Sequence, residues 1–328
     1  MTTVATTKRL VIAIAAIVIG VSAACGGGGG GSSTGGTAAK KYRFAVIPKA
    51  LDLPVFDYAR KGAERAAREL GNVEVIWRGP ETGDQLKQKE ILETFITQRV
   101  DGIAISCLNG DFLTEAINRA VDSGIPVVTW DADAPNSKRL AFYGVDDKTG
   151  GRIMAEEAVK LLGGKGTVAL MTSIGATNLT RRMDGVLEVL AKHPDIKIVE
   201  TFDVKEDTVK AAELIATGTN RYPNLGAWIS VGGWPVFTRN ALVPVPKTTH
   251  VVSFDTIPPA PQLLKEGKVA ILIGQKYFGW GIEPVKMLAD IKAGKMPTQK
   301  IVDSGVDIVR QDNVDAYIDR FRKLEEGK

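Results

Sequence analysis

From Tyr42 to the end of the chain, short runs of apolar and β-branched residues alternate with longer segments in which apolar residues recur every three or four positions. The short runs are typical of buried β-strands, and the longer segments are typical of amphipathic helices. The predicted strands are 42–47, 73–77, 102–106, 125–130, 165–171, 197–199, 227–230, 249–254 and 269–273. The predicted helices are 55–70, 84–98, 111–123, 149–162, 179–192, 208–217, 235–242, 259–265 and 313–324.

Near-continuous apolar strands that alternate with helices predict parallel sheets with helices on both faces, which is an α/β fold. The alternation begins a second time near residue 165, after a first series of similar length. We therefore expect two similar lobes, each with its own sheet, rather than one large sheet. Asp146 precedes the predicted helix 149–162 and is expected to cap its N-terminus.

The first 24 residues have a different pattern. Lys8 and Arg9 precede an uncharged apolar run at 10–21, and small residues follow at 22–24. This order is typical of a secretory signal peptide. The apolar run is shorter than the ~20 residues that a membrane-spanning helix needs. We expect residues 1–24 to be a signal peptide.

Cys25 follows these small residues directly, and residues 25–41 are rich in Gly, Ser and Thr. A cysteine in this place resembles the lipobox of bacterial lipoproteins, although Ser22 stands where that motif favours an aliphatic residue. We expect a lipid on Cys25 that anchors the protein to a membrane, and a flexible tether over 25–41. The alternative is an uncleaved membrane anchor of the same topology. In both cases the folded part lies outside the cytoplasm, in the periplasm or on the outer face of the cytoplasmic membrane.

Composition excludes several classes of function. About 290 residues remain after the tether, which is enough for two lobes with separate cores. The net charge is +4, but Lys and Arg are spread among Asp and Glu, so no basic cluster indicates a nucleic-acid partner. With Cys25 and Cys107 as its only cysteines, the chain has no disulfide framework, and Cys107 is expected to be a small core residue. His193 and His250 have no zinc-site spacing, so we expect neither a metal nor a cofactor.

Polar and aromatic side chains follow the ends of several predicted strands. In open α/β sheets, ligands bind beyond the carboxyl ends of the strands, so these side chains are the candidate site. The candidates are Phe56, Asp131, Asp133, Asn178, Thr180, Arg182, Trp234, Asp255 and Gln275.

These residue types suit a ligand with many hydroxyl groups. Carboxylates accept hydroxyl protons in strong charge-assisted bonds, and amides both donate and accept. Phe56 or Trp234 offers an aromatic surface for the C–H face of a sugar ring. The set has no histidine and no nucleophile beside a base, so the sequence indicates a binding protein and not an enzyme.

Five of the candidates also have a structural alternative. Asp131 and Asp133 are favoured turn residues and could serve only as turn caps. Asp255 could cap the helix that follows it. Trp234 could belong to the core of a lobe, and Arg182 could form only structural ion pairs.

Several ordered segments resemble the type I periplasmic binding protein superfamily, and specifically its ribose-binding-like branch, which serves sugar ABC transporters. The resemblance extends from about Tyr42 to the C-terminus. The segments that carry it are Val-Asp-Gly-Ile-Ala-Ile-Ser at 100–106, Gly-Ile-Pro-Val-Val-Thr-Trp-Asp at 124–131, the continuation to 140, Gly-Val-Asp-Asp at 144–147, Gly-Gly-Arg at 150–152, Val-Ser-Phe-Asp at 252–255 and Ile-Gly-Gln at 273–275.

The resemblance implies two Rossmann-like lobes that are joined by three crossings and close on a ligand by hinge motion. Mapped onto this chain, the crossings fall near Gly144–Val145, Gln275 and Ser304. The N-terminal lobe is then 42–144 plus 276–304, and the C-terminal lobe is 145–275 plus 305–328. The binding positions that the resemblance carries over are Phe56, Asp131, Asn178, Asp255 and Gln275.

The chain departs from ribose binders at positions where those proteins have planar polar groups. A methyl group or a single hydroxyl does not replace the several N–H donors of a guanidinium or an amide. We therefore expect a ligand other than ribose. The departures are Leu53, Ala132, Thr180 with the charge moved to Arg181, and the pair Gly232 and Gly233.

The sequence therefore predicts an extracytoplasmic solute-binding protein that captures a sugar or polyol between two lobes and delivers it to an ABC permease. We expect it to be a monomer. The alternative is a ligand-sensing receptor component of the same fold that signals to a chemoreceptor or a membrane kinase.

Overall fold

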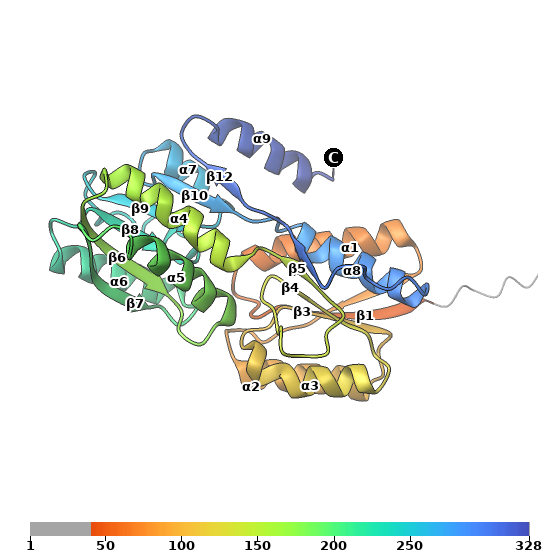
Figure 1. Ribbon diagram of the computed structural model, residues 1–328. Helices are drawn as coiled ribbons and strands as arrows, with labels where there is room; N and C mark the ends of the chain where they lie inside the picture. The colour runs from red at the N-terminus through yellow and green to blue at the C-terminus, as the bar shows by residue number, and fades with distance from the viewer. Residues whose placement is uncertain (1–40, 328) are drawn as a thin grey trace, which may run out of the picture. The chain divides into compact units, whose positions relative to one another are not determined.

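The computed structural model describes residues 41–327, which form two α/β lobes, each built on a six-stranded sheet (Figure 1). The two-lobe α/β fold predicted from the hydrophobic pattern is confirmed. The first sheet has the order β11 (Ile301–Asp303), β5 (Ala141–Gly144), β4 (Val127–Trp130), β3 (Gly102–Ile105), β1 (Tyr42–Ile47), β2 (Val73–Trp77). The second has the order β12 (Asp307–Val309), β10 (Ile271–Gly274), β9 (His250–Phe254), β8 (Ala227–Ser230), β6 (Gly166–Thr172), β7 (Ile196–Asp203).

Every strand pair in the first sheet is parallel, and in the second sheet only β12 runs antiparallel to its neighbour. The central strands β3, β4, β8 and β10 are buried along their whole length, as expected when helices cover both faces. Three segments pass between the sheets, after β5, after β10 and between β11 and β12.

Helices from distant parts of the sequence cover each sheet. On the first sheet, α1 (Val55–Leu70) packs with α8 (Gly279–Lys292) on one face, and α2 (Gln85–Thr97) packs with α3 (Gly110–Asp122) on the other (Figure 1). The second lobe carries α4 (Asp147–Leu162), α5 (Thr177–Leu190), α6 (Thr208–Arg221), α7 (Ala260–Lys265), a 3₁₀ turn at Trp234–Val236 and α9 (Val314–Glu325).

Glycines allow two helix pairs to approach at backbone distance. A Cβ on Gly281 of α8 would overlap the carbonyl oxygen of Ala59 in α1. A Cβ on Gly151 of α4 would overlap the carbonyl oxygen of Arg182 in α5. The second contact seats Arg182 directly beside α4, which bears on the site described below.

The predicted helix at 235–242 is wrong. Only Trp234–Val236 form a 3₁₀ turn, and residues 238–244 follow as bends and turns. Proline at 244 disfavours the helical conformation in the residue before it, and a second proline follows at 246. Asp146 caps α4 as predicted, because Asp146 Oδ1 accepts a hydrogen bond from the Thr149 backbone N–H at 3.3 Å.

Candidate functional site

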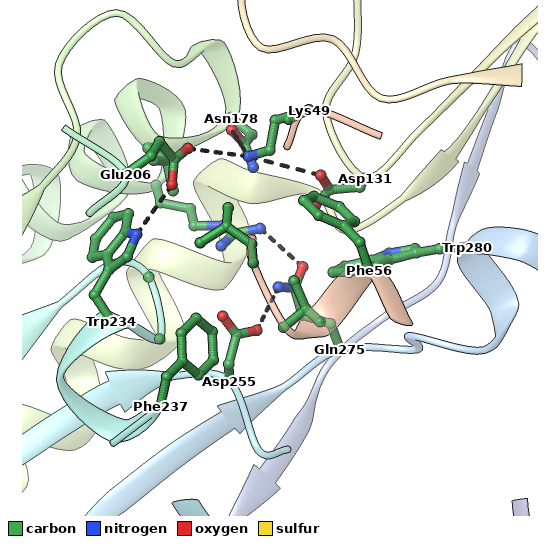
Figure 2. Close-up of a pocket in the computed structure, with 16 residues that line it drawn as sticks. Lys49, Phe56, Asp131, Asn178, Glu206, Trp234, Phe237, Asp255, Gln275 and Trp280 are labelled. Atoms are coloured by element: carbon green, nitrogen blue, oxygen red, sulfur yellow. Dashed lines mark hydrogen bonds and ion pairs between the residues drawn. The ribbon is translucent and has the colours of Figure 1, made fainter. Parts of the chain in front are cut away.

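Seven of the nine candidate side chains line one cavity, which both lobes form beyond the carboxyl ends of their strands (Figure 2). They are Phe56, Asp131, Asn178, Arg182, Trp234, Asp255 and Gln275. Asp131 directly follows β4, Asp255 follows β9 and Gln275 follows β10, as the strand-end rule predicts. The cavity volume is ≈ 30 Å³. A cavity of that volume holds about two water molecules.

All three carboxylate residues that line the cavity have a left-handed backbone conformation. The φ angles are 57° at Asp131, 57° at Glu206 and 74° at Asp255. A residue with a Cβ pays roughly 1–2 kcal/mol in this region, although Asp tolerates it better than most. Such strain is concentrated at functional sites, where the surrounding structure holds it in place. The sharp turns after β4 and β9 aim the short Asp side chains into the cavity.

Arg182 organises the side of the cavity that belongs to the second lobe. Its Nε donates to Asp147 Oδ1 at 2.8 Å, and its Nη2 donates to Gln275 Oε1 at 2.9 Å. Because Gln275 accepts through its oxygen, its Nε2 points the other way and donates to Asp255 Oδ1 at 2.9 Å. The guanidinium also lies 4.1 Å from the ring centroid of Phe254. Arg182 therefore both lines the cavity and fixes which way the Gln275 amide faces.

Burial changes the protonation of two acids in this network. It raises the pKa of Asp147 to about 7, although the charge of Arg182 opposes the shift. Burial also raises the pKa of Asp255, against the lowering effects of Arg182, Gln275 and Tyr277. Both carboxyl groups are thus easier to protonate than an exposed Asp, and the hydrogen bonds that they accept favour their ionised form.

Lys49 and Glu206 form a second network that the sequence analysis missed. Lys49 Nζ lies 3.4 Å from Asn178 Oδ1, 3.4 Å from Glu206 Oε1 and 3.8 Å from Asp131 Oδ2 (Figure 2). The other oxygen of Glu206 accepts from Trp234 Nε1 at 3.1 Å. Burial alone would lower the pKa of Lys49, but the charges of Glu206 and Asp131 outweigh it and raise that pKa. Lys49 follows β1 and Glu206 follows β7, so the strand-end rule applied to every strand would have found both.

Aromatic rings form two sides of the cavity. Phe56 packs against Trp280 with ring centroids 6.1 Å apart, and against Trp130 in an edge-to-face arrangement at 5.7 Å. Trp234 and Phe237 line the cavity from the second lobe. Trp280 and Phe237 were also missed, because an aromatic residue in a helix or loop is usually core.

Besides the buried Trp280 Nε1, three polar side-chain atoms of the lining have no hydrogen-bond partner within residues 41–327. They are Asp131 Oδ1, Asp255 Oδ2 and Asn178 Nδ2, while the companion oxygens of the two acids are engaged by Ser106 and by Gln275 with Tyr277. Two acceptors and one donor, held by engaged neighbours between aromatic rings, can bind hydroxyl groups. Among the described residues, no group of His, Cys, Asp and Glu is arranged to hold a metal ion.

Asp133 and Thr180 lie outside this cavity, so their assignment to it is corrected. The two Asp133 oxygens accept from Arg139 Nε at 2.8 Å and Arg139 Nη2 at 2.6 Å, which is a bidentate pair that leaves the carboxylate no role in the cavity. The Thr180 hydroxyl donates to the Ala176 carbonyl within the first turn of α5. The Asp133 carboxylate thus has a structural role in this ion pair, which differs from the turn cap that the sequence suggested.

Three other expectations have clear outcomes. Asp255 does not cap α7, because that helix has no side-chain cap and the Asp255 carboxylate accepts from Gln275 and Tyr277 instead. Cys107 is fully buried in the core of the first lobe, as predicted. Cys25, the signal peptide and nearly all of the tether lie outside the described residues. Within 41–327, no helix has the length and hydropathy that crossing a membrane requires.

Comparison with known proteins identifies similar chains. The sequence model of the family described as periplasmic binding protein domain matches residues 44–296 of this chain. The D-allose-binding periplasmic protein of Escherichia coli is 28% identical over 280 residues, which cover 80% of this chain and 90% of that protein. The solved structure of an ABC transporter solute binding protein from Burkholderia graminis, in complex with D-arabinose, is 34% identical with a TM-score of 0.80 and covers 85% of this chain and 98% of its own. A solute binding protein from Agrobacterium vitis, bound with α-D-tagatopyranose, is 25% identical with a TM-score of 0.79 and covers 86% and 99%.

Proposed function

The chain belongs to the periplasmic binding protein family, and on that premise we propose that it captures a sugar or polyol between its two lobes and delivers it to an ABC permease. One observation carries the proposal: the unpartnered atoms of Asp131, Asp255 and Asn178 come from both lobes and meet in a single cavity between aromatic rings. A ligand that bonds to all three holds the lobes together, so binding is coupled to closure. The family and its relatives are binding proteins of transport systems and not enzymes.

Each side chain has a distinct part in the proposed complex. Asp131 and Asp255 accept hydroxyl protons, and the Asn178 amide donates. Gln275 contacts the ligand in the orientation that Arg182 imposes on it. Phe56 and Trp234 pack on the C–H faces of the ring.

The ligand is a sugar or polyol other than ribose. Leu53 lines the cavity where ribose binders have an amide, and Ala132 follows Asp131 where they have an arginine. The cavity thus lacks two planar donor groups that a pentose of that shape uses. One similar protein is named for D-allose, and two others have solved structures with D-arabinose and α-D-tagatopyranose, so these sugars are the first candidates.

Isothermal titration calorimetry of the purified mature protein tests the proposal. The panel contains D-allose, D-arabinose, D-tagatose, xylitol and D-ribose. We expect at least one of the first four to bind in the micromolar range and ribose to bind more weakly. No heat of binding from any of them at millimolar concentration would contradict the proposal. Loss of uptake of the labelled sugar in a deletion strain then separates transport from sensing.

The location of the protein rests on its N-terminus. We propose that residues 1–24 are removed, that Cys25 carries lipid and that residues 25–41 tether a monomer to the membrane. Lipid attachment contributes about 0.8 kcal/mol per buried CH₂, so several acyl chains hold the protein firmly. Cys25→Ser should prevent labelling by an alkyne fatty acid and release the protein from the membrane fraction. A mature N-terminus beyond Cys25 in a freely soluble protein would rule this out.

The lobe boundaries are part of the same proposal. We place the N-terminal lobe at 42–144 plus 276–304 and the C-terminal lobe at 145–275 plus 305–328. The membership of the two sheets supports this division. Hydrogen exchange with and without sugar tests it, because protection should change at the three crossings and not within either sheet.

A further inference from the structure

Tyr277 bonds to an acid of the ligand cavity without lining that cavity itself. It lies between β10 and α8, two residues after Gln275, and only 2% of it is exposed. Its hydroxyl donates to Asp255 Oδ1 at 3.0 Å. Tyr277 is not among the residues that line the ligand cavity, and it lines a separate cavity of ≈ 410 Å³ instead. An effect of Tyr277 on the ligand must therefore pass through Asp255.

Aromatic contacts fix the ring of Tyr277. Trp280 packs against it edge to face with ring centroids 5.1 Å apart, and Phe321 does the same at 6.3 Å. The ring of Tyr58 lies at 6.4 Å. These three rings belong to α8, α9 and α1, so three helices determine where the hydroxyl lies. A phenylalanine at this position keeps the ring contacts and loses only the hydroxyl.

The hydrogen bonds around the Tyr277 hydroxyl have one consistent direction. The backbone N–H of Thr256 can only donate, and the Tyr277 oxygen accepts from it at 2.9 Å. An ionised Asp255 can only accept, so the phenol hydrogen points to Asp255. The Thr256 hydroxyl, 3.2 Å from the Tyr277 oxygen, must then donate to it, and the Tyr317 hydroxyl donates to Thr256 in turn. Hydroxyl groups in such a chain polarise one another, which strengthens the last bond, to the carboxylate.

The Asp255 carboxylate depends on these donors for its orientation. Rotation about the last side-chain bond of an Asp is only loosely restricted, so the backbone does not fix the carboxylate plane. Two donors converge on Oδ1, Tyr277 Oη at 3.0 Å and Gln275 Nε2 at 2.9 Å. They leave Oδ2 as the oxygen that has no partner within residues 41–327. Burial raises the pKa of Asp255, and the hydrogen bond from Tyr277 acts in the opposite direction.

We propose that Tyr277 is a positioning residue of the binding site, whose hydroxyl holds the Asp255 carboxylate in the plane that presents Oδ2 to a ligand hydroxyl. The proposal rests on the proposed function in making Asp255 a ligand contact. Gln275 also holds this carboxylate, but Gln275 lines the cavity and can touch the ligand itself. Tyr277 acts only through Asp255.

Calorimetry of Tyr277→Phe over a range of pH tests the proposal. We expect the Kd for the tightest-binding sugar of the panel to rise about tenfold near neutral pH, the effect of losing one hydrogen bond to a charged group. Binding should weaken as the pH falls through the pKa of Asp255, because a protonated acid is a weaker acceptor. The midpoint of this weakening should lie at higher pH in Tyr277→Phe, since the variant lacks a donor that favours the ionised form.

A change of the opposite sign strengthens the test. Replacing Tyr277 with 3-fluorotyrosine keeps the hydroxyl and makes it a stronger donor. Burial raises the pKa of Tyr277 well above its ordinary value, so the fluorinated phenol stays protonated. The midpoint should then move to lower pH. An unchanged midpoint in both variants would overturn the proposal, as would a shift of both in the same direction.

Other groups near Asp255 also carry charge or titrate. They are Arg182 of α5, Asp131 after β4, Tyr317 of α9 and, behind Arg182, Asp147, whose pKa burial raises to about 7. Tyr277→Phe leaves all of them in place, so their own steps stay in the profile of the variant. Asp255→Asn should remove the step that belongs to Asp255, and Tyr277→Phe in that background should move no midpoint. A shift that persists without Asp255 would overturn the proposal.

Tyr317→Phe is the matched control for a purely structural effect. It removes a hydroxyl that bonds to Thr256 but none that bonds to Asp255. Both Phe variants should lose stability in urea unfolding, because each takes a hydrogen-bond partner from the buried Thr256. The midpoint of Tyr317→Phe should move less than that of Tyr277→Phe. Equal shifts would make the effect structural and refute the role of Tyr277.

A measurement without sugar separates this proposal from the proposed function. Carbon-13 NMR of labelled aspartate carboxyl groups reports the pKa of Asp255 directly, with Asp255→Asn to assign its signal. We expect a higher pKa in Tyr277→Phe than in wild type, and an equal pKa would overturn the role of Tyr277. If the pKa rises but wild-type protein binds no sugar of the panel, the proposed function fails while the control of Asp255 by Tyr277 stands.

Discussion

Asp131→Asn separates ligand binding from folding at this site. Asp131 has a φ of 57°, a conformation that Asn adopts more readily than other residues with a Cβ. Asn also has the same shape and keeps an oxygen that can accept the 2.7 Å hydrogen bond from Ser106 Oγ. The substitution removes the negative charge and leaves the backbone and its packing in place.

The expected loss is confined to the oxygen that faces the cavity. In the proposed complex, Asp131 Oδ1 accepts one sugar hydroxyl, and a hydrogen bond to a charged group contributes about 1.5–3 kcal/mol. At about 1.4 kcal/mol for each factor of ten, the Kd for the sugar rises roughly 10- to 150-fold. The free energy of unfolding should change by less than about 1 kcal/mol, because the bond from Ser106 persists and Lys49 keeps its nearer acceptors, Asn178 and Glu206.

Asp133→Asn is the control, since Asp133 stands two residues away and is paired with Arg139 outside the cavity. Calorimetry gives the Kd of each variant, and urea unfolding gives its stability. We expect Asp131→Asn to change the Kd alone and Asp133→Asn to change the stability alone. The reverse pattern, with an unchanged Kd in Asp131→Asn and a weakened one in Asp133→Asn, would refute the reasoning about this loop.

Three further substitutions test the local geometry. Asp146→Ala should lower the free energy of unfolding by about 1 kcal/mol near neutral pH by removing the cap of α4. Burial would raise the pKa of Asp146, but the hydrogen bonds from Thr149 outweigh burial and lower that pKa. The stabilisation by the cap is therefore present above the pKa of Asp146 in the unfolded chain and is lost as the pH falls through its pKa in the folded protein. If urea unfolding in strong acid still showed a difference between Asp146→Ala and wild type, this reasoning would be wrong. Gly233→Ala should weaken sugar binding by about tenfold in calorimetry, because its Cβ would lie 2.7 Å from the Asp255 Cβ and displace it; unchanged affinity would show that this turn can yield. Gly281→Ala should destabilise the first lobe by about 1–3 kcal/mol in urea unfolding without changing the affinity, because α8 and α1 touch at this position, and a fully stable variant would argue against that contact.

The pattern of apolar residues was sufficient to predict most of the fold. Strands β1, β2 and β8 have the predicted bounds, because apolar and β-branched or aromatic residues dominate all three runs. Helix α8 was missed because Gly279, Gly281 and Pro284 all disfavour a helix in isolation. Its packing on α1 stabilises it, and Gly281 makes that packing possible.

Site residues that directly follow a strand were predicted from the sequence. Site residues whose place depends on pairing with a distant part of the chain were missed. Asp131 and Asp255 are the first residues after β4 and β9, so they could be identified from the predicted ends of these strands. Lys49 and Glu206 also stand near strand ends, but long charged side chains in loops are normally solvated, and nothing local shows that they meet across 157 residues. In the sequence, Asp133 is as plausible a ligand-binding residue as Asp131. Only the folded loop places Arg139 beside Asp133.

The left-handed turns at Asp131 and Asp255 also limit how this protein can be redesigned. Any side chain placed there must tolerate a positive φ, which excludes Val, Ile and Thr and favours Asn and Gly. A combinatorial library aimed at a new ligand would therefore waste most of its members if these two codons were fully randomised. Diversity is better directed to Leu53, Phe237 and Trp280, which line the same cavity with negative φ angles and leave the two acids as constant anchors.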